Sequence, residues 1–247
     1  MNKKIIPFFA VIIFIFTRIT RFGITKKNKK RLCVIAIIGV VSFLFISRSI
    51  VFYDNSLYFK FQKTICVSAF SNQNVSFLKY MTNVDDLAIA GQQFKDLSFT
   101  QNMPKLKKIW VAMCGIDDIT ELEKISKLQD VTISSTDLED ISPLKNLTEI
   151  QNIDISFNEK LSNISCLSKL NKIKKLEIRE TPISDISVIK NMPLLETLDI
   201  QQTKVTDISP IFELKNLKIL YIDKEMATDE DVKKLSEMGV EVKFDNE

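Results

Sequence analysis

The 247-residue chain contains no histidine, and glycine is scarce at five residues. The lack of histidine removes the commonest general base, the usual serine and cysteine catalytic dyads and most zinc sites. No phosphate-binding loop, dinucleotide-binding motif or nucleophile elbow occurs. The sequence therefore predicts a protein that is not an enzyme, with no cofactor, no metal site and no evident small-molecule substrate.

Cysteine is also rare, and Cys33, Cys66, Cys114 and Cys166 stand far apart in the chain. This spacing indicates neither a disulfide framework nor a metal cluster, so we interpret the four as packing residues. Oxidation of Cys66 with another cysteine stays open as an alternative.

From Val84 to Glu247 the sequence repeats every 22 residues, with one extra residue near Lys160. Each copy has a leading apolar residue followed by two more, three and five positions later. The leading residues are Val84, Leu106, Leu128, Ile150, Ile173, Leu195 and Leu217. Because so short a unit cannot bury its apolar side alone, we expect an α/β repeat fold. It is a leucine-rich repeat solenoid with a parallel strand ladder, one continuous core and short convex 3-10 or turn segments.

Two further positions of each copy carry polar residues with an expected structural role. The position eight residues after the leading one can bond the turning backbone, and holds Gln92, Cys114, Thr136, Asn158, Thr181, Thr203 and Glu225. Later, an acid or amide precedes an apolar residue, as in Asp140-Ile141-Ser142-Pro143-Leu144, and can cap the short helical turn that follows. These predicted structural caps are Asp96, Asp118, Asp140, Asn163, Asp185, Asp207 and Asp229. The alternative, a metal-binding stripe, does not explain why asparagine is tolerated.

The phrase I-x-D-I-S-P-L in 22-residue copies resembles the internalin-type leucine-rich repeat of bacteria, from about Gln62 to the C-terminus. The resemblance implies an extracellular or surface-bound solenoid that recognises a partner with its concave strand face.

The N-terminal part predicts one or two transmembrane helices. Leu32 to Ile46 is uncharged and apolar, and its extension to Tyr53 contains Arg48 as the only basic residue. A helix over residues 32–53 would be about 33 Å long, enough for a hydrocarbon core of about 30 Å. Residues 5–16 form a second apolar run of about 18 Å, which we interpret as a short span or an interfacial helix.

A basic loop between the two apolar runs predicts the orientation. Its positive charges are Arg18, Arg21, Lys26, Lys27, Lys29, Lys30 and Arg31. Short basic loops stay in the cytoplasm, so we expect the solenoid outside the cell. Residues 1–61 carry 11 basic and 1 acidic residue, and residues 62–247 carry 23 basic and 30 acidic residues. The acidic second part disfavours nucleic acid as a partner.

The predicted organisation has five parts. Residues 1–31 are a short apolar segment and a basic cytoplasmic loop, and residues 32–53 a transmembrane helix. Residues 54–83 are a linker and a degenerate N-terminal capping repeat, and residues 84–227 the leucine-rich repeats. Residues 228–247 are a C-terminal capping helix and strand that cover the open end of the core.

The concave strand face is the remaining place for function. Four positions after the leading residues come Ala88, Trp110, Thr132, Asp154, Glu177, Asp199 and Tyr221. Six positions after them come Ala90, Ala112, Ser134, Ser156, Arg179, Gln201 and Asp223. The candidate ligand-binding residues are Trp110, Asp154, Glu177, Arg179, Asp199, Tyr221 and Asp223. An acidic row between two aromatic rings suits a basic protein or peptide. The alternative is a solvated polar face in which Arg179 neutralises its neighbours.

The sequence thus favours a membrane-anchored bacterial recognition protein that binds a protein or peptide outside the cell. One alternative is an accessory structural subunit of a complex, docked on a membrane-embedded partner. The other is an inhibitor or immunity factor that captures a secreted toxin.

Overall fold

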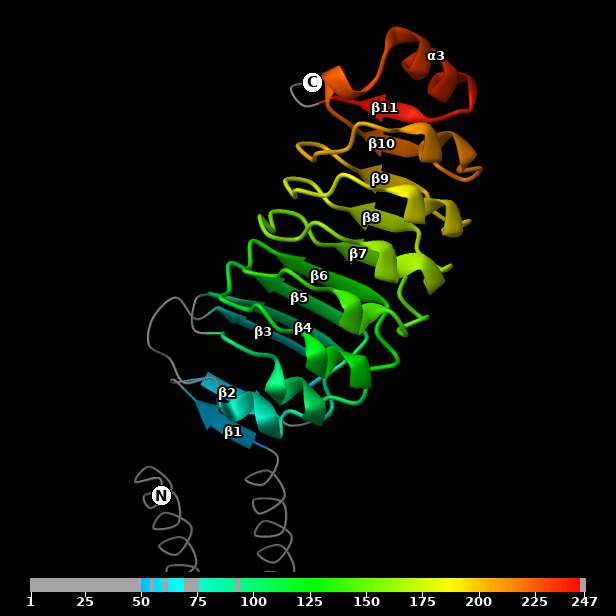
Figure 1. Cartoon of the computed structure of the whole chain (residues 1–247). Coiled ribbons are helices and arrows are strands. Elements are labelled where there is room, and N and C mark those ends of the chain that lie inside the picture. Colours follow the sequence, from blue (N-terminus) through cyan, green and yellow to red (C-terminus); the bar gives the residue numbers. More distant parts are fainter. Residues whose placement is uncertain (1–49, 54–55, 60–61, 69–75, 92–93, 245–247) are drawn as a thin grey trace, which may run out of the picture. The chain divides into compact units, whose positions relative to one another are not determined.

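The computed structural model describes residues 50–53, 56–59, 62–68, 76–91 and 94–244. Nine strands form one sheet in which each strand pairs in parallel with the next along the chain (Figure 1). They are β3 (Thr64–Ser68), β4 (Asp86–Ala90), β5 (Lys108–Ala112), β6 (Asp130–Ser134), β7 (Asn152–Asp154), β8 (Lys175–Glu177), β9 (Thr197–Asp199), β10 (Ile219–Tyr221) and β11 (Glu241–Lys243). This ladder is the leucine-rich repeat solenoid that the sequence predicts.

Short 3-10 helices return the chain on the side opposite the strands (Figure 1). They are η1 (Ser76–Tyr80), η2 (Ser98–Asn102), η3 (Thr120–Lys124), η4 (Ser142–Leu144), η5 (Ser165–Lys169), η6 (Ser187–Asn191) and η7 (Ser209–Glu213). An eighth, η8 (Lys224–Met226), follows β10. The predicted convex 3-10 segments are therefore confirmed.

The core lies between the strands and the 3-10 helices. In the copy that contains β5, the apolar residues Leu106, Ile109 and Val111 are buried, and the equivalent residues of the other copies are buried with them. One apolar cluster runs without a break from Ile65 to Val240. Because burying a leucine or isoleucine stabilises a fold by about 1.5–3 kcal/mol, the stacked copies hold each other in place.

Each of the six strands β4 to β9 is followed, within three residues, by a residue in a left-handed conformation, which the sequence did not indicate. Gly91 has φ 115°, and φ is 51–59° at Met113, Ser135, Phe157, Glu180 and Gln202. L-residues resist this conformation by about 1–2 kcal/mol. At the first five of these positions the backbone N–H continues the ladder, as in the 2.8 Å bond from Phe157 N to the carbonyl of Arg179. The Gln202 N–H instead donates to the side chain of Asp223. The turn is thus maintained by the stacking of neighbouring copies.

A helix and a strand close the C-terminal end. Helix α3 (Asp229–Glu237) precedes β11, which pairs with β10. Thr228 caps the helix, because its side chain accepts a hydrogen bond from the backbone of Asp231 while the Asp231 carboxylate accepts from the Thr228 N–H. The prediction of Asp229 as a cap is wrong, since Asp229 is the first residue inside α3.

The N-terminal boundary differs from the prediction. Strand β1 (Ile50–Tyr53) pairs with β2 (Ser56–Phe59) in a separate two-stranded sheet. The last four residues assigned to the transmembrane helix are therefore a strand, in keeping with their β-branched and aromatic side chains. The predicted linker likewise contains β2, and β3 adds a complete strand to the ladder.

The remaining membrane predictions fall outside the described residues. These are the apolar run of residues 5–16, the basic loop and residues 32–49. Within the described ranges, no helix combines the length and the apolar character needed to cross a bilayer.

Candidate functional site on the concave strand face

The strand register brings the predicted central row together. Trp110, Thr132 and Asp154 are direct partners on β5, β6 and β7, and Asp154 continues to Glu177, Asp199 and Tyr221 on β8, β9 and β10. Neighbouring strands lie about 4.8 Å apart, so these side chains form one continuous row. Lys243 extends it, with its ammonium 5.5 Å from the centre of the Tyr221 ring.

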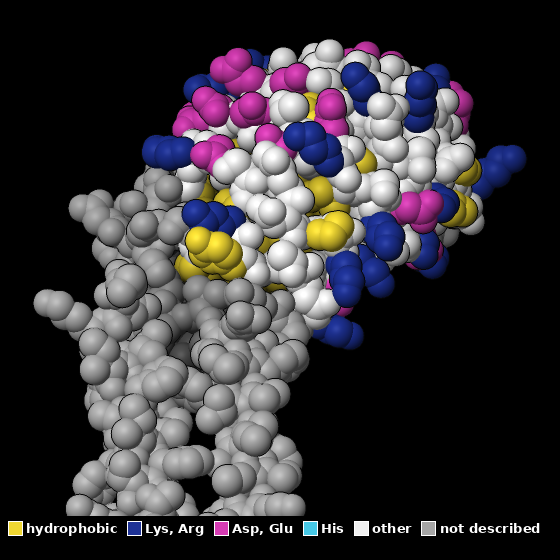
Figure 2. Space-filling view, turned by 90° about the horizontal axis from the view of Figure 1, so that it is seen from below, with side chains coloured by type: hydrophobic (Ala, Val, Ile, Leu, Met, Phe, Trp, Pro, Cys, Tyr) yellow, Lys and Arg dark blue, Asp and Glu magenta, His cyan; other side chains and the backbone are white. Residues whose placement is uncertain are grey.

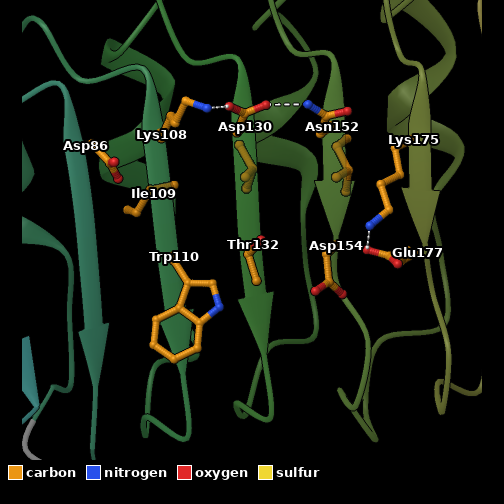
Figure 3. Close-up of a pocket in the computed structure, with 12 residues that line it drawn as sticks. Asp86, Lys108, Ile109, Trp110, Asp130, Thr132, Asn152, Asp154, Lys175 and Glu177 are labelled. Atoms are coloured by element: carbon orange, nitrogen blue, oxygen red, sulfur yellow. Dashed lines mark hydrogen bonds and ion pairs between the residues drawn. The ribbon is translucent and has the colours of Figure 1, made fainter. Parts of the chain in front are cut away.

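A hollow of about 450 Å³ opens on this face across β4 to β8, with Trp110 at one side (Figure 3). Trp110 is 41% exposed. Its neighbours on β4 and β5 are the small residues Ala88 and Ala112, so the indole stands above its surroundings. On the other side of Trp110, Thr132 separates the ring from Asp154 (Figure 3). Tryptophan is one of the residue types most enriched at the anchoring positions of protein interfaces, so Trp110 is the first candidate on this face.

A second row lines the same hollow and was missed by the sequence interpretation. It consists of Asp86, Lys108, Asp130, Asn152 and Lys175, each two positions after a leading apolar residue. Because alternate residues of a strand share a face, the period of two could have identified this row together with the other two.

Both lysines of this second row form ion pairs. Lys108 Nζ lies 2.7 Å from Asp130, which also accepts a hydrogen bond from Asn152. The hydrogen bond and the charge of Asp130 raise the pKa of Lys108. Lys175 Nζ lies 2.8 Å from Glu177, so Glu177 of the central row is charge-balanced (Figure 3).

The two aspartates of the central row lie in different environments. Asp154 is half-buried, and its Oδ1 accepts a 3.1 Å bond from the Ser156 N–H. Asp199 is 9% exposed, and its Oδ1 accepts a 3.0 Å bond from the Gln201 N–H. Burial raises the pKa of Asp199 to about 6; repulsion from Glu177 and Asp154 adds to the rise, and the Gln201 bond and Arg179 oppose it.

Two other candidate residues are tied to the backbone or to neighbouring side chains. Arg179 donates a 2.8 Å bond to Gln201 Oε1 and forms a 3.7 Å ion pair with Glu180. Asp223 Oδ2 accepts a 2.8 Å bond from the Gln202 N–H, which caps the left-handed turn after β9. These contacts give Arg179 and Asp223 a part in holding the face together.

The predicted caps act through one recurring hydrogen bond. In six copies the side-chain oxygen accepts from the N–H two residues later, at 2.7–2.8 Å, as between Asp140 and Ser142. The bonded residue begins the 3-10 helix, and the apolar residue between them occupies the cap position itself. Bonds from the following serine or threonine lower the pKa values of Asp118, Asp185 and Asp207. Among the described residues, no cluster of acids and cysteines that could hold a metal ion occurs.

The side chain of Asn158 forms five hydrogen bonds inside the solenoid. It is fully buried, and its Nδ2 donates to the carbonyls of Ile133, Ile155 and Ser156. Its Oδ1 accepts from the N–H and the hydroxyl of Thr136. Asn158 thereby connects two successive copies, whereas the equivalent Thr181 and Thr203 bond a carbonyl of their own copy.

Neither a protein-family model nor a curated protein sequence matches this chain. Solved structures of other proteins do match this chain. The internalin InlF of Listeria monocytogenes aligns over 77% of this chain and 57% of its own, with 23% identity and a TM-score of 0.66. Internalin C2 of the same species aligns over 72% and 79%, with 24% identity and a TM-score of 0.58.

A leucine-rich repeat protein of Leptospira interrogans aligns over 74% of this chain and 52% of its own, with 15% identity and a TM-score of 0.59. This chain therefore spans only a little over half of the Leptospira protein and of InlF. At these identities the likeness shows the fold alone: the chain has the leucine-rich repeat solenoid found in bacterial internalins.

Proposed function

We propose that this chain is a membrane-anchored recognition protein whose solenoid binds a protein or peptide on its concave face outside the cell. The observation that carries the proposal is the hollow beside Trp110, where an exposed indole and the Asp154 carboxylate lie on either side of Thr132 (Figure 3). Solenoids of stacked repeats offer extended concave surfaces of the kind that bind proteins.

The charges of the hollow favour a basic partner. Its charged side chains are Asp86, Asp130, Asp154 and Glu177 against Lys108 and Lys175. Both lysines are already paired with acids, so the excess charge is negative. Charge complementarity of this kind speeds association and selects among partners.

The N-terminal sequence supports the membrane location. The apolar run of residues 32–46 follows the basic loop of residues 18–31, and such loops stay in the cytoplasm. This arrangement would direct the solenoid to the outer side of the membrane.

The test is affinity capture with the tagged full-length chain from detergent-solubilised membranes. We compare the wild type with Asp154→Lys/Glu177→Lys and with the matched control Asp137→Lys/Glu139→Lys, which changes the same charge at exposed positions outside the hollow. A partner recovered by the wild type and the control but lost with the first variant supports the proposal. Equal recovery by all three rejects the concave face as the binding site.

A further inference from the structure

Trp110 presents the main apolar surface of the hollow. The other apolar residues that line it are Ile109, Val131 and Ile153, which are 1–2% exposed. A purely apolar partner group would therefore contact one indole ring and otherwise polar atoms. The group that fits must offer a face to the indole and hydrogen-bond donors to its neighbours.

In the row of Trp110, Asp154 is the carboxylate of the hollow that no lysine of the hollow pairs with. Asp86, in the second row, lies opposite Lys108, and its charge acts on that lysine. Asp130 is shared by Lys108 and Asn152, and Glu177 is bound by Lys175. Within the described parts of the chain, the Asp154 side chain accepts only the N–H of Ser156. A donor from a partner can therefore reach this carboxylate without displacing a lysine.

The distance between the two side chains suits a flat cation. Trp110 and Asp154 lie two strand spacings apart, or about 9.5 Å between backbones. Stacking on the ring needs about 3.5–4 Å and a charged hydrogen bond about 2.8 Å. Thr132, between them, is short enough to leave this space open (Figure 3).

We propose that the hollow is a pocket for one arginine side chain of the partner, stacked on Trp110 and bonded to Asp154. The inference rests on the proposed recognition role of the concave face and names the group that this face selects. Arginine fits better than lysine, because its planar guanidinium stacks on an aromatic ring and donates two parallel bonds to a carboxylate.

Trp110 is the only tryptophan of the chain, so its fluorescence reports directly on the pocket. The probe is the blocked tripeptide glycine–arginine–glycine, titrated into the full-length chain in detergent micelles. The control peptide carries citrulline, which keeps the shape of arginine but has no charge. We expect a saturable change in Trp110 emission with the arginine peptide, a weaker one with the lysine analogue, and none with citrulline.

Substitutions locate the binding. Asp154→Asn should weaken the arginine peptide about fivefold, the upper end for an exposed ion pair. The matched variant Asp137→Asn, at an exposed position outside the hollow, should bind as the wild type does. The pocket is refuted by an absent response, by an equal response to citrulline, or by an unchanged affinity in Asp154→Asn.

The two proposals fail separately. If the peptide titration leaves the Trp110 emission unchanged, and the captured partner is nevertheless lost from Asp154→Lys/Glu177→Lys, only the arginine pocket is refuted. If the arginine peptide changes the Trp110 emission, but the captured partner still binds that variant, the recognition role of the concave face is refuted.

Discussion

Asp199 on β9 lies directly opposite Glu177 on β8, and two like charges thus meet at a position where Asp199 is almost completely buried. Like charges on directly opposed residues destabilise a sheet. The pKa of Asp199 is raised to about 6, chiefly because burial disfavours its ionised form. This aspartate therefore costs the fold stability when it is charged.

The first prediction is a pH dependence of unfolding due to Asp199. In the folded chain its pKa is about 6 against an ordinary value of 3.8, so between these values the folded state binds more protons than the unfolded state. Stability should fall as the pH rises through this window and then level off. Asp199→Asn should flatten this decline and raise stability near pH 7 by about 1–2 kcal/mol. Urea unfolding at several pH values measures the free energy of unfolding. If Asp199→Asn has the same pH profile as the wild type, Asp199 is not the source of the decline.

The second prediction concerns the aspartates that precede the 3-10 helices. Asp118→Ala and Asp140→Ala should each cost about 1 kcal/mol, because the first N–H of the helix loses its acceptor. Asp140→Asn should cost little, since Asn163 makes the same bond at 2.8 Å. The lowered pKa of Asp118 means that its contribution is present at neutral pH and is lost as the pH falls through the folded pKa.

Melting in the presence of calcium tests the alternative that these aspartates form a metal-binding stripe. If they form a metal stripe, calcium should raise the melting temperature of the wild type, and replacement of Asp118 and Asp140 by asparagine should abolish the rise. The capping geometry predicts the same melting temperature with calcium and with a chelator.

The third prediction concerns Asn158. Asn158→Ala should cost about 3 kcal/mol, because three carbonyls and the Thr136 donors lose a buried partner. Thr203→Val removes the bond to the Ile200 carbonyl and the long 3.5 Å bond from the Val205 N–H, and should cost about 1 kcal/mol. Urea unfolding followed by Trp110 emission compares the two. An equal loss in both variants would show that Asn158 does not connect the copies as its contacts indicate.

The fold could be predicted because every copy repeats the same apolar spacing. Leu106, Ile109 and Val111 are three buried residues of one pattern, and the pattern recurs until the core is closed. The left-handed turns could not be predicted in this way, because Met113 and Phe157 have no intrinsic preference for that conformation. Their backbone is determined by the neighbouring copy.

The candidate site could be predicted only in part. Period-two alternation placed Trp110 and Asp154 in one row, since strand register follows from the repeat. It could not reveal that Asp199 is buried, or that Lys175 pairs with Glu177, because both depend on side-chain packing across strands. The boundary near Ile50 was misjudged for another reason: an apolar run of β-branched and aromatic residues suits a strand as well as a helix.

The fourth prediction tests the proposed orientation in the membrane. Cys66 is exposed, whereas Cys114 is buried and burial raises the pKa of Cys166 to about 11. Because the thiolate is the reactive form, Cys66 should react fastest of the three at neutral pH. A membrane-impermeant maleimide should therefore label Cys66 on intact cells, and Cys66→Ser should remove most of the label. Labelling only after lysis would place the solenoid in the cytoplasm.

The last prediction separates the roles of charge and of the aromatic ring in partner binding. The acids of the hollow should act mainly on association, so salt should slow the on-rate of the captured partner, since the Debye length is only about 8 Å at physiological ionic strength. Trp110→Ala should instead raise the dissociation rate, by a factor that corresponds to a hot-spot loss of about 2 kcal/mol or more. Tyr80→Ala is the matched control, because Tyr80 is another exposed aromatic residue, located in η1 outside the strand ladder. Surface plasmon resonance with the immobilised full-length chain measures both rates. If Trp110→Ala and Tyr80→Ala release the partner at the same rate as the wild type, the indole is not an anchor, and the ring is simply an exposed side chain on a solvated face.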